Sequence, residues 1–131
     1  MTGSTAAAYI GKAERALEEA QFLLRANKTE GACSRAYYAM HDAAHAALFA
    51  TGNEAPDTII KTHHSLIAAF GKKIVLSGQI DAAFGRALNR VHDIRLLADY
   101  SAEPPSFDDA RWAIEQAADF IDAIRAGFVK A

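Results

Sequence analysis

Apolar residues recur every three or four positions along most of the chain, which is the spacing of one buried face of an α-helix. This pattern predicts five helices, at about residues 5–26, 30–50, 63–76, 80–100 and from 106 onwards. No segment combines the strict alternation of a strand with flanking turn residues. The sequence therefore predicts an all-α fold, an up-and-down antiparallel bundle of four to five helices, in a single domain over residues 1–131.

Residues at the helix ends support these boundaries. Asn27 is expected to stop the first helix and Gly52 the second, because both residue types tolerate the left-handed conformation that follows many helices. Thr29 is the candidate N-cap of the second helix and Ser106 that of the last. The consecutive prolines at 104–105 cannot lie inside a helix, so they separate the last two.

Some residues are predicted to lie in contacts between helices. Residues 30–50 are small or aromatic on most sides of their helix, which predicts a central place in the bundle. Gly71 and Gly85 stand outside any glycine-rich run, so we interpret them as close helix contacts and not as phosphate-binding loops. Trp112 is placed on the apolar face of the last helix.

Composition and charge narrow the class of protein. Hydrophobic residues make up 51% of the chain and charged residues 23%, as in soluble globular domains. The net charge of −2 argues against binding nucleic acid over a broad surface but leaves room for a small basic site. A single cysteine, Cys33, excludes an internal disulfide and fits a reducing compartment. Without a secretory signal or a membrane-length apolar run, we expect a cytoplasmic protein with no membrane partner.

The end of the fourth predicted helix holds the first set of candidate site residues. Helical spacing places His92, Arg95 and Asp99 on one side. In one interpretation, Arg95 and Asp99 form a structural ion pair at a helix seam. In the other, Arg95 binds a phosphate while His92 or Tyr100 transfers protons.

The second predicted helix brings further polar side chains to one of its sides. Arg35 lies near Tyr37, Tyr38, His41 and His45, and the last three share a side. Two histidines four residues apart can bind a metal ion. No cysteine, aspartate or glutamate continues that line, so hydrogen-bonded core histidines are the preferred interpretation, and neither a metal nor another cofactor is predicted.

The start of the third predicted helix is a candidate anion site. Lys61, Thr62 and His63 stand at a helix N-terminus, where free backbone N–H groups can hold an anion. Thr62 contributes a hydroxyl group. The equal alternative is a capped helix end with exposed histidines.

Three segments together resemble the HEPN domain: residues 34–44 (SRAYYAMHDAA), residues 61–70 (KTHHSLIAAF) and residues 95–100 (RLLADY). The resemblance covers essentially the whole chain. It implies a helical bundle that usually forms a homodimer, in a prokaryotic setting, often with a minimal nucleotidyltransferase as partner. It also implies binding of RNA or nucleotides, and in many members metal-independent endoribonuclease activity, including that of toxins in toxin–antitoxin pairs.

The ribonuclease members of the family that the chain resembles have an arginine followed about four to six residues later by a histidine. Two copies of this motif meet in a cleft between two chains. The arginine stabilises the charge on the phosphate, and the histidine moves a proton. Carried over, the arginine is Arg95, but Asp99 and Tyr100 stand where the histidine is expected. Arg86 and His92 offer the same spacing earlier on the helix. In related toxins a tyrosine near this motif is modified by the nucleotidyltransferase, which makes Tyr100 a candidate.

Three hypotheses follow. The first is a HEPN-like protein that acts on or binds RNA or nucleotides at a dimer cleft, with catalysis left open. Its site residues are catalytic His92, Arg95, Asp99 and Tyr100, and phosphate-binding Arg35, Tyr38, His41, Lys61 and His63. The second is a non-catalytic module that binds a nucleotide or regulates a nucleotidyltransferase. The third is a metal-binding bundle that uses His41 and His45.

Overall fold

Five α-helices contain most of the residues that the computed structural model describes, which are residues 2–129. They are α1 (Thr2–Arg25), α2 (Thr29–Ala50), α3 (His63–Phe70), α4 (Ala82–Tyr100) and α5 (Phe107–Phe128), with a π-helical turn η1 (Gly71–Val75) directly after α3. Residues 2–129 contain no β-strand. The all-α prediction is confirmed.

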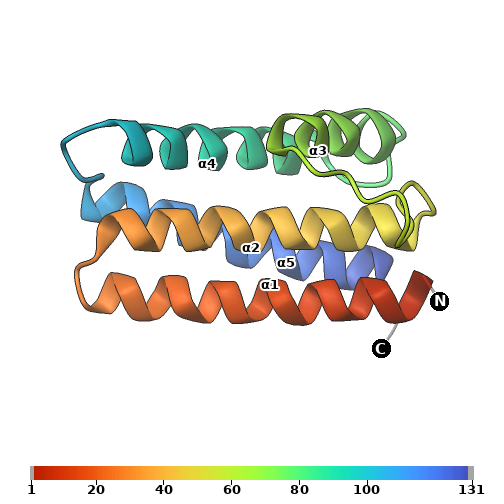
Figure 1. The fold of residues 1–131 in the computed structure, drawn as a ribbon, viewed down its shortest axis with the longest axis horizontal. Helices are drawn as coiled ribbons and strands as arrows, with labels where there is room; N and C mark the ends of the chain where they lie inside the picture. The colour runs from red at the N-terminus through yellow and green to blue at the C-terminus, as the bar shows by residue number, and fades with distance from the viewer. Residues whose placement is uncertain (1, 130–131) are drawn as a thin grey trace.

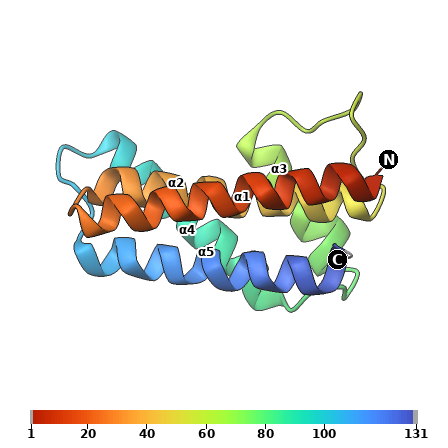
Figure 2. The ribbon, with the colours of Figure 1, turned by 90° about the horizontal axis from the view of Figure 1, so that it is seen from below.

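Helix α2 is the centre of the bundle. It contacts α1, α3, α4 and α5, and it lies between α1 and α4 in Figure 1. Helix α5 covers the far side of α2 and runs beside α1, as Figure 2 shows. The largest wholly buried side chains include Tyr37, Met40 and Phe49 of α2. The predicted central place of this helix is confirmed.

The helix ends confirm most of the predicted caps. Asn27 follows α1 with a φ of 60°, and Gly52 follows α2 with a φ of 77°. The hydroxyl of Ser106 accepts a hydrogen bond of 3.0 Å from the backbone N–H of Asp109. The prediction for Thr29 is wrong, because this buried residue is already the first of α2 and no side chain caps that helix.

Packing predictions were borne out at one glycine only. A Cβ atom on Gly85 would come 3.1 Å from Cγ2 of Val75, so this glycine is a close helix contact as predicted. Gly71 has open space where its Cβ atom would be, and the prediction for it is wrong. The prediction for Trp112 is also wrong, because its side chain is 36% exposed in a groove between α4 and α5. No helix in the described part of the chain is long and apolar enough to cross a lipid bilayer.

Candidate functional site

Aromatic and basic side chains from three separate segments meet on one side of α2. The group, called the Arg95 cluster below, consists of Tyr37, Tyr38 and His41 of α2, His63 of α3, and His92 and Arg95 of α4. The His63 ring lies 5.2 Å from His41 and 5.9 Å from His92, measured between centroids. The structure thus brings together five predicted site residues from three helices, and Tyr37 joins them.

Arg95 provides the cation of the cluster. Its guanidinium carbon lies 5.3 Å from the Tyr37 ring centroid and 5.5 Å from that of Tyr38, which is within cation–π range. Nη2 lies 3.2 Å from Oδ2 of Asp99, and the Arg95 side chain is only 14% exposed. Nε and Nη1 are buried and have no hydrogen-bond partner. Because buried donors are almost always paired, these two atoms are available to an anion.

A hydrogen bond fixes the role of His63. The Tyr37 hydroxyl lies 2.9 Å from Nδ1 of His63. Burial raises the pKa of Tyr37, so its hydroxyl keeps the proton and donates it to Nδ1. Burial, followed by the charges of His41 and Arg95, lowers the pKa of His63. The ring is therefore neutral near pH 7 and carries its proton on Nε2, which leaves a donor for a ligand.

His92, in contrast to the donor His63, has a ring nitrogen that can accept a proton. Its ring centroid lies 4.9 Å from that of Tyr37, and its Nδ1 is buried without a partner. Burial is the main cause that lowers its pKa, and the positive charge of Arg95 is the next. A neutral imidazole has one ring nitrogen free to accept a proton. His92 can therefore act as a base beside the arginine.

Arg35 extends the cluster toward α1. Its guanidinium carbon lies 5.6 Å from the Tyr38 ring centroid, and Nη2 lies 2.9 Å from Oε1 of Glu19. Its Nε is buried and without a partner. The predicted phosphate-binding residues Arg35, Tyr38 and His63 thus lie in one continuous group with Arg95.

His41 and His45 have different surroundings. Nδ1 of His41 lies 3.3 Å from Oδ1 of the buried Asp42. Nδ1 of His45 donates to the carboxylate of Glu54 at 2.7 and 2.9 Å, and both side chains are buried. Burial is the main cause that lowers the pKa of His45. In the described residues no three histidine, cysteine or carboxylate side chains are grouped so that they could hold a metal ion.

Of the predicted site residues, two lie away from the Arg95 cluster, whereas Arg35 and Asp99 contact its members. Tyr100 is 85% exposed at the end of α4, and Lys61 is exposed just before α3. No described contact joins either of them to the cluster. Sequence reasoning, in turn, named Tyr37 on this helix without giving it a role, and it did not single out Glu54. The spacing of Tyr37 and His41 on one helix was the only signal for the first, and none existed for the second.

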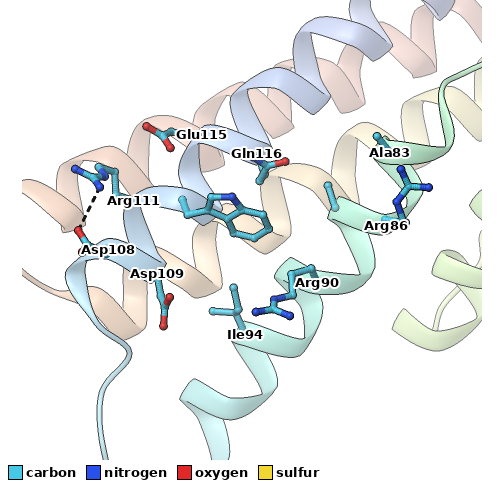
Figure 3. A pocket seen from close by; sticks show the side chains of 11 residues that line it. Ala83, Arg86, Arg90, Ile94, Asp108, Asp109, Arg111, Glu115 and Gln116 are labelled. Carbon is cyan, nitrogen blue, oxygen red and sulfur yellow. Dashed lines mark ion pairs between the residues drawn. The ribbon is translucent and has the colours of Figure 1, made fainter.

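A hollow of about 820 Å³ lies elsewhere, between α4 and α5. Figure 3 shows Arg86, Arg90 and Ile94 entering it from α4. From α5 come Asp108, Asp109, Arg111, Trp112, Glu115 and Gln116. Its arginines are matched in number by carboxylates, and Arg111 already pairs with Asp108 at 3.2 Å. Arg86 lines this groove and His92 does not, so the alternative arginine–histidine pair is divided between two faces of α4.

Comparison with known proteins gives a family match and several similar proteins. The family model described as the HEPN domain matches residues 6–126. A protein of Methanocaldococcus jannaschii, provisionally named as a toxin, is 34% identical over 90% of this chain and 84% of its own length. A Thermotoga maritima protein named as a UPF0332 protein is 30% identical over 86% of this chain and 83% of its own. Another UPF0332 protein, from Gloeobacter violaceus, is also 30% identical and covers 86% of both chains.

Proposed function

The chain belongs to the HEPN domain family, and on that premise we propose that it is a toxin-type protein that binds RNA at the Arg95 cluster and cleaves it without a metal ion. One observation carries the proposal. Nε and Nη1 of Arg95 and Nδ1 of His92 are buried without partners, although all three belong to the same cluster. Leaving such atoms unpaired costs free energy that bound RNA would recover, because its phosphate accepts from Arg95 and its 2′-hydroxyl donates to His92.

Each group has a distinct part in the proposed reaction. Arg95 binds the non-bridging phosphate oxygens and stabilises the charge of the phosphorane, and the Nε2–H of His63 donates to the same group. The 2′-hydroxyl oxygen attacks the adjacent phosphorus while His92, with its own proton on Nε2, accepts the hydroxyl proton at Nδ1. The bond to the 5′-oxygen breaks, that oxygen takes a proton from water, and the hydroxide that remains takes the proton held by His92. The products are a 2′,3′-cyclic phosphate and a 5′-hydroxyl end.

The proposal includes protein partners. A second copy of the chain would form a cleft with the cluster, and a minimal nucleotidyltransferase would be the antitoxin. Leu97 and Tyr100 are 69% and 85% exposed near the end of α4, so they support a protein contact beside Arg95. The exposure of Tyr100 also supports its modification by that partner.

The test is cleavage of a labelled structured RNA in EDTA. We expect wild type and Arg86→Ala, a control on the other face of α4, to produce ends with a 2′,3′-cyclic phosphate. Arg95→Ala should lose at least about a hundredfold in rate while circular dichroism shows equal helicity. Cleavage that persists in Arg95→Ala, or that requires added Mg²⁺, would contradict the proposed reaction.

A second candidate function is binding without cleavage. The ion pair between Arg95 and Asp99 favours it, since the position of the expected histidine is taken by a carboxylate that holds the arginine. In that case the chain would bind a nucleotide or regulate its nucleotidyltransferase. RNA binding that depends on Arg95, with no cleavage by any variant, would select this candidate.

A further inference from the structure

Two arginines from different helices contact the same aromatic ring. The guanidinium carbons of Arg35 and Arg95 lie 5.6 and 5.5 Å from the centroid of Tyr38. They are therefore no more than about 11 Å apart. Each has a buried nitrogen without a hydrogen-bond partner. Two cations around one ring, both with donors unused, fit a ligand that has two negative groups.

The carboxylates that hold these arginines face solvent. Arg35 pairs with Glu19, whose side chain is 61% exposed, and Arg95 pairs with Asp99, whose side chain is 41% exposed. Ion pairs that are open to water are weak, because water and salt screen both partners. A phosphate, which an arginine binds through two parallel hydrogen bonds, can therefore replace either carboxylate.

The surface next to Arg35 carries an exposed aromatic side chain among charged ones. Arg35 lines a hollow between α1 and α2 together with Arg15, Glu18, Glu19, Phe22 and Leu23, so two arginines and two glutamates share it. Phe22 is 66% exposed, which is unusual for a large aromatic side chain. An exposed aromatic ring beside a phosphate-binding cation is a stacking platform for a base. A strand that reaches Arg35 would find this ring beside its second phosphate.

We propose that Arg35 is a second phosphate subsite, so that the ligand is a single-stranded oligonucleotide with consecutive phosphodiesters and not a mononucleotide. This inference rests on the proposed function, because Arg95 binds the first phosphate. Arg35 leaves Glu19 when the strand binds, while Tyr38 stays in contact with both guanidinium groups. Glu19 competes with the strand for Arg35.

The experiment compares two ligands that differ by one phosphodiester. The affinities of 2′-O-methyl UpU and 2′-O-methyl UpUpU are measured by calorimetry, since the methyl groups prevent cleavage. For wild type we expect at least about tenfold tighter binding of the longer ligand, the effect of one added charge-assisted contact. Arg35→Gln should lower this ratio to about threefold or less. Glu19→Gln should raise the ratio, and Arg86→Gln, on the other face of α4, should leave it unchanged.

The outcomes separate this inference from the function on which it rests. An equal ratio in wild type and Arg35→Gln, with UpU still bound through Arg95, would overturn the second subsite alone. If wild type does not bind UpU, or if Arg95→Gln binds it equally well, the proposed function falls and the inference falls with it. Circular dichroism of each variant checks that the helices are intact.

Discussion

The hydroxyl group of Tyr37 lies 2.9 Å from Nδ1 of His63, although the two residues are 26 positions apart in the chain. This hydrogen bond attaches the first residue of α3 to the middle of α2. It also selects the tautomer of His63, because a protonated tyrosine can only find an acceptor at a ring nitrogen without hydrogen. The binding properties of His63 thus depend on a wholly buried tyrosine.

Replacement of Tyr37 by phenylalanine tests this dependence. Tyr37→Phe removes the hydroxyl and leaves Nδ1 of His63 without its partner, so the free energy of unfolding should fall by about 1 kcal/mol. The nitrogen chemical shifts of His63 should change from those of a pure Nε2–H tautomer to those of a mixture. Urea denaturation and NMR measure the two effects. Unchanged His63 shifts would contradict the assigned tautomer.

Acid should destabilise the protein because His63 and His92 are partly buried and resist protonation in the folded state. Burial lowers the pKa of both His63 and His92 below the ordinary value of 6.5, so the unfolded chain binds protons more readily than the folded one. Their contribution to stability is complete above pH 6.5 and is lost as the pH falls through the folded-state values. The free energy of unfolding should therefore decrease from pH 7 downward.

The control for this pH dependence is a double variant. His63→Gln with His92→Gln removes both titrating rings, so its stability should vary less between pH 7 and about pH 5 than that of wild type. His45, whose pKa is also lowered by burial, remains in both proteins and accounts for the residual slope. Parallel pH profiles for the two proteins would show that these rings do not control acid stability.

The buried pair of His45 and Glu54 should be important for stability. The Glu54 carboxylate accepts hydrogen bonds from the His45 ring and, at 2.7 Å, from the backbone N–H of Ile60. Glu54→Ala leaves both donors unpaired and the His45 ring buried, and we expect a loss of about 3–5 kcal/mol in unfolding free energy. Glu54→Gln keeps an acceptor and should lose less. Glu18→Ala, at an exposed position, should change stability by under about 0.5 kcal/mol in the same denaturation assay.

The helices could be predicted from the sequence because their signals are local. The spacing of apolar residues and the caps at Asn27, Gly52 and Ser106 depend only on near neighbours in the chain. The structure divides the predicted 63–76 helix into α3 and the π-helical turn η1, and no local pattern in the sequence indicated this division. Trp112 shows the same limit, since periodicity gives the face of a helix but not how closely the next helix approaches.

The site was predictable as a set of residues but not as an arrangement. Helical spacing correctly joined Arg95 to Asp99, which form an ion pair within one helix. Contact between Arg95, Tyr38 and His63 depends on how three helices are rotated, and no local pattern encodes that rotation. Glu54 lies in a polar loop that sequence alone assigns to solvent, yet its side chain is fully buried against His45.

Two glycines should respond to alanine in opposite ways. Gly71 has helical backbone angles and open space around the missing Cβ, so Gly71→Ala should stabilise the protein by about 0.5–1 kcal/mol. Gly78 has a φ of 81°, a conformation that strains any residue with a Cβ, so Gly78→Ala should destabilise by about 1–2 kcal/mol. The denaturation midpoints should move in opposite directions, and a shift of both in the same direction would refute this account.

Asp99 pairs with Arg95, so removal of its negative charge tests whether Arg95 binds an anion. Its carboxylate is 3.2 Å from Nη2 of Arg95 and is 41% exposed, so Asp99→Asn should cost no more than about 1 kcal/mol of stability. The same change removes a negative charge that competes with phosphate, and binding of 2′-O-methyl UpU should tighten about two- to tenfold. Asp119→Asn, at an exposed position on α5, should leave that affinity unchanged.

Cleavage by the same variant separates the two roles open to Asp99. If the carboxylate only holds Arg95 between turnovers, the rate of RNA cleavage at low substrate should rise together with affinity, because more of the arginine is free. If the carboxylate also moves a proton, affinity should rise while the rate falls, since an amide cannot accept one. Weaker binding by Asp99→Asn would contradict both roles and would mean that the ion pair orients Arg95 for the phosphate.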